Sequence, residues 1–284
     1  MNEELFKLPS DEGHELAIWK ISQPEIPTKH HIYMTHGTFS DKRICRGIAS
    51  YLAKKGYTSW IMEWRGHGAS TIPKEKYNFE TIAKKDVPIA FEYLFNELNI
   101  KELSCVLHSG GGAIMAMFLT HNQQYISKIK SMTMFGSQTT GAGNSMSNKI
   151  KLFVGKYVTA LLGHSYASMF GRPHDETYFM MKLWYDWNLS RRFLGENNFD
   201  YDEHLPKITT PIFSIHGKKD TFIATKSGSE EFLHAFQNPK NKFLSCGKNN
   251  GYSEDYDHGR VMLSRNAEKE VWPQVLEWIV EHHC

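Results

Sequence analysis

The stretch VLHSGGGAIMAMFL, at residues 106–119, joins an apolar run typical of a buried strand to a second apolar run of helical length. Ser109 and three glycines lie at the junction. A serine on such a turn would lie at the carboxyl edge of a parallel sheet, where ligands bind, and the helix N-terminus would favour developing negative charge. The alternative is structural: Ser109 caps the helix, and the glycines permit close packing.

Outward from this turn, short β-type segments alternate with helical segments along most of the chain. Strands are expected at residues 30–37, 57–64, 102–109, 128–137, 211–217 and 242–246. Helices are expected at residues 41–56, 79–98, 110–122 and 226–236, and in a final segment that runs toward Ile279. This alternation predicts an α/β fold with a doubly wound, mostly parallel sheet.

The alternation breaks between residues 138 and 205. The loop QTTGAGNSMS opens this segment, and apolar stripes at helical spacing follow in KIKLFVGKYVTALLG and YFMMKLWYDWNL. We interpret residues 138–205 as a helical cap insertion, with residues 1–137 and 206–284 as the two parts of the core domain. Part of each stripe is expected to pack on the sheet domain and part to line a pocket. A plain packed subdomain is the alternative.

The composition argues against several classes of partner. The 33 basic and 31 acidic side chains leave a formal net charge of +2, which provides no strong field for nucleic acid. The N-terminal segment is acidic where a signal peptide would be basic, and no segment is apolar over the roughly 18 residues that a membrane span requires. We therefore expect a cytoplasmic protein without a membrane span.

Cysteines and histidines give no sign of a metal site. The cysteines are Cys45, Cys105, Cys246 and Cys284. They are scattered without ligand spacing, which suggests reduced thiols. The pairs His30-His31 and His282-His283 have no further ligand nearby at the spacing of a zinc site. We expect neither a metal nor a cofactor.

Five motifs follow one another in a characteristic order. They are HGT (36–38), RGHGAS (65–70), the Ser109 turn, GKKD (217–220) and DHG (257–259). With these motifs the chain resembles the α/β-hydrolase superfamily, most closely serine hydrolases of the monoacylglycerol lipase and proline iminopeptidase type. The resemblance covers nearly the whole chain except the cap. One departure is Leu107, which stands where the family turn G-x-S-x-G has its first glycine.

The resemblance implies a role for each site residue. Ser109 would be the nucleophile, His258 the base and Asp220 the carboxylate that orients it, because a serine hydroxyl needs both partners to attack near neutral pH. Asp255 and Asp257 are rival carboxylates beside His258. Asp220 is preferred because it follows a strand, where site residues of such sheets gather. The resemblance also implies an oxyanion hole formed by the backbone N–H groups of Thr38 and Gly110.

The function expected from this set is hydrolysis of a small-molecule carboxylic ester with a short to medium acyl chain. The reaction would pass through an acyl-enzyme at Ser109 and need no cofactor. An acyltransferase or an iminopeptidase could use the same triad, and a catalytically weak ligand-binding protein could share the fold. The sequence does not predict an oligomeric state.

Overall fold

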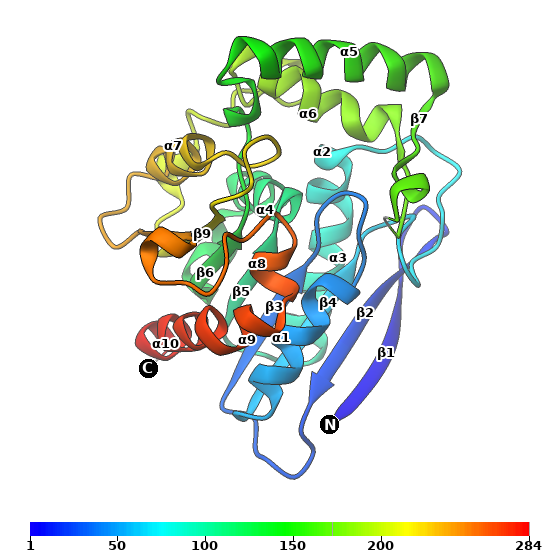
Figure 1. Cartoon of the computed structure of the whole chain (residues 1–284). Coiled ribbons are helices and arrows are strands. Elements are labelled where there is room, and N and C mark those ends of the chain that lie inside the picture. Colours follow the sequence, from blue (N-terminus) through cyan, green and yellow to red (C-terminus); the bar gives the residue numbers. More distant parts are fainter. Residues whose placement is uncertain (172, 284) are drawn as a thin grey trace.

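The structure is a computed structural model in which residues 1–171 and 173–283 are described. Its main sheet has the strand order β1-β2-β4-β3-β5-β6-β9-β10 (Figure 1). These strands are β1 (Asn2–Pro9), β2 (Glu15–Ser22), β3 (His30–Thr35), β4 (Tyr57–Glu63), β5 (Leu103–His108), β6 (Ile129–Phe135), β9 (Ile212–Gly217) and β10 (Lys242–Cys246). From β4 to β10 in this order the neighbours are parallel, whereas the β1–β2 and β2–β4 pairs are antiparallel. The predicted α/β fold with a mostly parallel sheet is confirmed.

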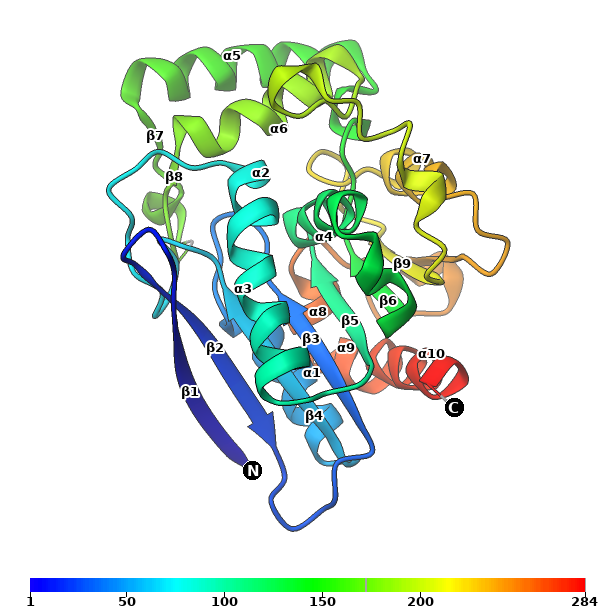
Figure 2. The same cartoon turned by 180° about the vertical axis from the view of Figure 1, so that it is seen from behind.

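Helices cover both faces of the sheet (Figures 1 and 2). They are α1 (Arg43–Ala53), α3 (Val87–Glu92), α4 (Gly110–His121), α7 (Lys226–Ala235), α8 (Arg260–Leu263), α9 (Arg265–Glu270) and α10 (Trp272–His283). Successive side chains of a strand point to opposite faces. In β3, Tyr33 accordingly joins the core beside α3 and α4, while Ile32 and Met34 join the core beside α1 and α10. The sheet is therefore doubly wound, as predicted.

The helix predicted at residues 79–98 is present but irregular. α2 (Phe79–Thr81) leads into a π-helical turn at Ile82–Asp86, and a second π-helical turn at Tyr93–Glu97 follows α3. Pro88 lies at the start of α3. Its ring would clash with the carbonyl of the preceding turn and it has no N–H to donate, so a wider turn before it is a natural outcome.

The N-terminal hairpin of β1 and β2 was not predicted. Leu8 pairs with Leu16 across it, and β2 joins the hairpin to β4. β1 is the edge strand, and Leu8 is its one buried residue. An edge strand that buries so little of its surface has no clear alternation of apolar and polar residues, and this explains why the sequence pattern missed it.

Between β6 and β9 the chain leaves the sheet. It forms α5 (Met146–Leu162), the short strands β7 (His164–Ser165) and β8 (Glu176–Thr177), and α6 (Tyr178–Ser190). Both views place α6 between α5 and the rest of the molecule (Figures 1 and 2). The boundaries of a cap at residues 138 and 205 stay a prediction.

The two apolar stripes of this segment pack differently. On α6, Met180 and Trp187 join the main core of the sheet domain. On α5, Leu152 is the buried member of the expected stripe, whereas others such as Phe153 and Leu161 are exposed. The α5 stripe therefore lies mostly at the surface, because α6 separates α5 from the sheet.

Two further expectations concern thiols and membranes. Cys45, Cys105 and Cys246 are free and buried, and burial raises the pKa of each thiol. Cys284 lies outside the described residues. Within residues 1–171 and 173–283, no helix combines the length and the apolar character needed to cross a membrane.

Candidate active site

The backbone of Ser109 has a strained conformation, whereas a residue that only caps a helix normally has an unstrained, extended one. Ser109 lies between β5 and α4 with φ 53° and ψ −120°. A positive φ at a non-glycine residue is uncommon, and it costs on the order of 1–3 kcal/mol. The Ser109 side chain makes no capping hydrogen bond to α4. Its N–H donates to the Phe135 carbonyl at 2.8 Å, and its carbonyl accepts from Ser137 Oγ at 2.9 Å. These two bonds hold the turn.

The glycines around Ser109 allow segments to approach closely. A Cβ at Gly37 would lie 2.5 Å from Ser109 Cβ, and one at Gly111 would lie 2.8 Å from the His36 carbonyl oxygen. Neither glycine has a positive φ. Space, and not an unusual backbone conformation, therefore requires glycine at both positions.

Leu107, the departure from the family pattern, fits inside the sheet. It is fully buried and pairs with Thr35 of β3 and Met134 of β6. The bulky side chain thus belongs to the core, and Ser109 keeps its positive φ beside it.

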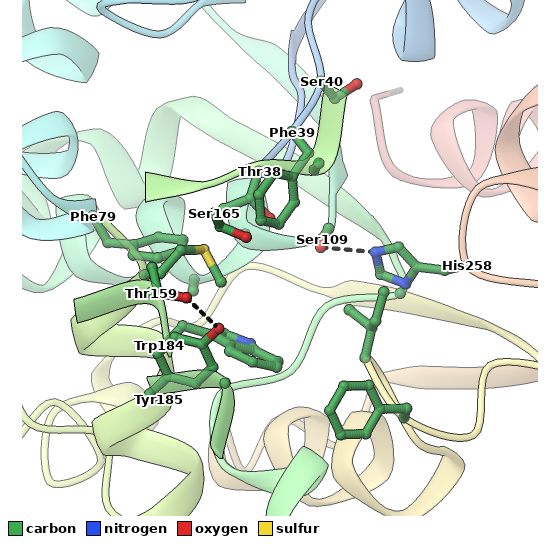
Figure 3. Close-up of a pocket in the computed structure, with 18 of the residues that line it drawn as sticks. Thr38, Phe39, Ser40, Phe79, Ser109, Thr159, Ser165, Trp184, Tyr185 and His258 are labelled. Atoms are coloured by element: carbon green, nitrogen blue, oxygen red, sulfur yellow. Dashed lines mark hydrogen bonds between the residues drawn. The ribbon is translucent and has the colours of Figure 1, made fainter. Parts of the chain in front are cut away.

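Three predicted site residues from distant segments meet beside a cavity that two of them, Ser109 and His258, line. His258, in the loop before α8, places Nε2 2.9 Å from Ser109 Oγ (Figure 3). Its Nδ1 lies 2.5 Å from Oδ2 of Asp220, which follows β9. Burial acts to raise the pKa of Asp220, but the hydrogen bond and the charge of His258 outweigh it, so the pKa lies below its usual range. Asp220 is therefore an ionised partner for the imidazole.

The rival carboxylates have other partners. Asp257 Oδ1 accepts the N–H groups of Gly259 and Arg260, at 3.0 and 2.8 Å. Asp255 Oδ1 accepts the Lys248 N–H at 2.9 Å. Both carboxylates thus stabilise local loops, and the structure brings Asp220 to His258.

Thr38 and Gly110 line the cavity together with Ser109. Gly110 is the first residue of α4, where N–H groups have no acceptor within the helix. Within residues 1–171 and 173–283, the Thr38 N–H donates to no backbone or side-chain acceptor. Both amides are thus available to a ligand at Ser109.

The cavity has a volume of about 650 Å³ and a mostly apolar lining. Figure 3 shows the Ser109 hydroxyl on one side, with Trp184 and Tyr185 of α6 among the residues that enclose the space. Its larger apolar lining residues include Phe39, Phe79, Val158, Leu162, Met169, Met181, Trp184, Trp187 and Phe222. A polar pair also lies in the wall, where Thr159 Oγ1 and the Tyr185 hydroxyl are 3.3 Å apart. None of the described lining residues is Asp, Glu, Lys or Arg.

The RGHGAS motif supports the site from outside the cavity. The buried Arg65 side chain donates through Nε to Asp86 Oδ1 at 2.8 Å. Ser70 Oγ donates to the Glu63 carbonyl at 2.7 Å and accepts the Ala17 N–H at 2.8 Å. These side chains tie the loop after β4 to its neighbours, which is a structural role.

Several lining residues were not predicted from the sequence. Phe39 directly follows the HGT motif, and Phe222 lies two residues after Asp220, so their positions beside known motifs were a usable signal. Phe79 begins a helix far from any motif, and no local pattern marks it. In the described part of the chain, no group of three or more His, Cys, Asp or Glu side chains could hold a metal ion.

Comparisons with known proteins agree with this architecture. A family model for the alpha/beta hydrolase fold matches residues 30–158. An esterase from Pyrococcus furiosus is similar at 16% sequence identity and a TM-score of 0.63, over 99% of this chain and 93% of that chain. An esterase from Exiguobacterium antarcticum is similar at 15% identity and a TM-score of 0.67, over 96% of this chain and 98% of that chain.

A thermophilic esterase from Thermogutta terrifontis is similar at 14% identity and a TM-score of 0.65, over 99% of this chain and 100% of that chain. No curated protein matches the chain significantly in sequence. At these identities the solved structures establish a common fold, and the activity must be argued from the site.

Proposed function

Because the chain has the alpha/beta hydrolase fold, we propose that it is a serine hydrolase that cleaves carboxylic esters through an acyl-enzyme at Ser109. One observation carries the proposal: from Ser109 Oγ, at the wall of an apolar cavity, hydrogen bonds run without interruption through His258 to Asp220. The strained backbone of Ser109 adds support, because such strain gathers at functional sites.

Acylation begins with the neutral imidazole of His258. Its Nε2 takes the proton of Ser109 Oγ as the oxygen attacks the ester carbonyl carbon. Asp220 accepts the Nδ1–H of His258, which fixes the tautomer and stabilises the imidazolium that forms. The ester carbonyl oxygen becomes an oxyanion, and the N–H groups of Thr38 and Gly110 donate to it.

The two halves of the reaction then mirror each other. The imidazolium returns its proton to the departing alkoxide, so the alcohol leaves and the acyl group stays on Ser109. In the second half His258 takes a proton from water as its oxygen attacks the acyl carbonyl carbon. The bond to Ser109 Oγ then breaks, the imidazolium returns the proton to Ser109 Oγ, and the carboxylic acid is released. An alcohol in place of water would give acyl transfer by the same steps.

The lining of the cavity favours a neutral substrate with an apolar acyl group. Aromatic and Met side chains offer an adaptable apolar surface. An iminopeptidase would need a carboxylate near the scissile bond to hold the substrate ammonium, and none of the described lining residues is acidic. We therefore place ester hydrolysis ahead of amide cleavage, with a short to medium acyl chain.

A substrate series run on the purified protein tests this function. p-Nitrophenyl esters from acetate to decanoate are compared with a prolyl arylamide, and Ser109→Ala serves as the control. We expect turnover of esters, little turnover of the arylamide and loss of both in the variant. A preference for the prolyl arylamide would assign a peptidase. No turnover of any member would favour a ligand-binding protein of this fold.

A further inference from the structure

We propose that Glu176 is a positioning residue whose buried carboxylate holds the loop after β3 in the geometry that the oxyanion hole requires. The inference rests on the proposed function, because the loop in question carries Thr38. Glu176 is not among the residues that line the cavity. Its effect would pass through the backbone at Phe39.

The contacts of Glu176 join three segments that are far apart in sequence. Glu176 lies in β8 and is fully buried, with an exposed fraction of 0%. Its Oε1 accepts the Phe39 N–H at 2.8 Å and faces His67 Nε2 at 3.0 Å. A single carboxylate oxygen thus ties β8 to the loop after β3 and to the RGHG turn after β4.

Phe39 is a strained position directly after Thr38. Its φ is 60°, a left-handed conformation that a bulky aromatic residue adopts only when its surroundings impose it. The hydrogen bond to Glu176 fixes the Thr38–Phe39 peptide plane. The Thr38 N–H belongs to the adjacent plane, one residue away. Loss of the Glu176 carboxylate would therefore let the loop relax and turn this N–H away from the oxyanion.

His67 anchors the carboxylate from the other side. Its Nε2 faces Glu176 Oε1, and its Nδ1 faces the Arg65 carbonyl oxygen at 3.0 Å. Both partners are acceptors, so only the imidazolium can donate to each of them. Burial acts to lower the pKa of His67, but the charge of Glu176 and the hydrogen bond to it outweigh burial, and the pKa is raised. The bond to Glu176 is therefore charge-assisted, and such bonds are stronger than those between neutral groups.

Other ionisable groups surround the pair without competing for the same atoms. The ring centroids of His36 and His174 each lie 5.1 Å from that of His67. Burial holds the pKa of His36 well below its usual range, so it stays neutral. His174 Nε2 lies 3.1 Å from Asp41 Oδ2, and Glu63 accepts backbone N–H groups of Lys42 and Ala69. The Tyr77 phenol is kept neutral, because burial and then the charge of Glu176 raise its pKa.

The second carboxylate oxygen shows that this arrangement carries a cost. Glu176 Oε2 is buried and has no hydrogen-bond partner among residues 1–171 and 173–283. A buried carboxylate oxygen without a partner reduces stability. A glutamine or an apolar residue would avoid part of that cost, so the position is better explained by what the charged oxygen holds than by packing.

The chain offers a matched control in Glu80. This carboxylate is also buried, and its Oε1 accepts the Tyr201 hydroxyl at 2.7 Å, which links α2 to the far end of the segment between β6 and β9. Its hydrogen-bond and ion-pair partners are the Glu196 N–H, Tyr201 and Lys84, and none of these belongs to the loop after β3. If the variants act by loosening the segment between β6 and β9 in general, Glu80 and Glu176 variants should lower kcat alike. If they act by misaligning Thr38, only the Glu176 variants should lower kcat.

The test compares Glu176→Ala, Glu176→Gln and Glu80→Ala in hydrolysis of p-nitrophenyl butyrate. We expect Glu176→Ala to lower kcat by roughly tenfold to a hundredfold with KM within about twofold, because an oxyanion donor acts mainly in the transition state. Glu176→Gln retains an acceptor for Phe39 and should recover part of kcat. Glu80→Ala should keep kcat close to wild type. Equal kcat values in the two alanine variants, or an effect on KM alone, would overturn the proposal.

Hydrogen exchange of the Phe39 amide gives a readout that does not depend on activity. It should be faster in Glu176→Ala than in the wild type and unchanged in Glu80→Ala. Unchanged exchange at Phe39 in Glu176→Ala would overturn the positioning role. If the wild type is inactive but Phe39 still exchanges faster in Glu176→Ala than in the wild type, the proposed hydrolase function is contradicted and the anchoring of the loop by Glu176 is supported. If Glu176→Ala does not fold, Glu176→Gln provides both readouts.

Discussion

Oδ2 of Asp220 lies 2.5 Å from Nδ1 of His258, across 38 residues of sequence. The carboxylate thus engages the ring nitrogen that points away from Ser109. Asp257, the residue next to His258, binds the N–H groups of Gly259 and Arg260 instead. The residue adjacent in sequence does not reach that nitrogen. The carboxylate that reaches it comes from the loop at the carboxyl end of a parallel strand, β9.

Asp220→Asn should lower kcat for ester hydrolysis by a factor on the order of 10⁴, because an amide cannot hold the required tautomer or stabilise the imidazolium. Asp257→Asn is the matched control and should cost far less, since its oxygen can still accept the two loop amides. Initial rates with p-nitrophenyl butyrate compare the two. A larger loss in Asp257→Asn would show that the wrong carboxylate has been assigned.

Gly37→Ala should reduce activity at least tenfold, because its Cβ would meet Ser109 Cβ at 2.5 Å and push the nucleophile or the oxyanion loop out of place. Overpacking of this kind also costs about 1–3 kcal/mol of stability. At Gly259 the nearest atom to a Cβ is 3.9 Å away, so Gly259→Ala should be much milder. Rates of ester hydrolysis and urea unfolding are measured for both variants. Equal losses of activity and stability in Gly37→Ala and Gly259→Ala would contradict the prediction.

Trp184→Ala should change the preference for acyl chain length, because this ring lines the cavity on α6. In the wild type, each further methylene that is buried can add up to about 0.8 kcal/mol of binding, so efficiency should rise from acetate toward a short or medium chain. The variant should lose efficiency on those esters and favour longer ones. Leu183→Ala on the same helix does not alter this lining and is the control. An unchanged profile in Trp184→Ala would place the acyl group elsewhere.

The contribution of His67 to stability should depend on pH. Its pKa is raised in the folded protein, so the stabilisation is fully present below the ordinary value of about 6.5 and is lost as the pH rises through the folded value. The free energy of unfolding of the wild type should therefore exceed that of His67→Gln most at low pH. Urea unfolding from pH 5 to 9 measures the difference. A difference that grows with pH would contradict the assigned charge of His67.

The periodic elements of the fold could be predicted from the sequence because they are buried on both faces. β5 is buried throughout and β6 nearly so, both are rich in apolar residues, and α4 begins directly after Ser109, which ends the turn from β5. The edge strand β1 buries only Leu8, so its sequence shows no apolar run that predicts a strand. The exposure of α5 could not be predicted either, because it depends on α6 lying beneath it and not on its own pattern.

The candidate site was predictable where motifs mark the ends of strands. Ser109, Asp220 and His258 each occur in a short recognisable motif, and the structure places their side chains within hydrogen-bonding distance. The link from Glu176 to Phe39 was not predictable, since it spans 137 residues and joins two segments without a shared pattern. Such contacts arise from tertiary packing alone.

Labelling with a fluorophosphonate probe tests whether Ser109 is the nucleophile, because the probe reacts with an activated serine and not with an ordinary hydroxyl. The purified wild type, Ser109→Ala and Asp220→Asn are treated with the probe, and the site is mapped by mass spectrometry. We expect a single adduct on Ser109 in the wild type, slow labelling in Asp220→Asn and none in Ser109→Ala. A folded wild type that stays unlabelled, or an adduct on another residue that persists in Ser109→Ala, would contradict the assignment of Ser109 as the nucleophile.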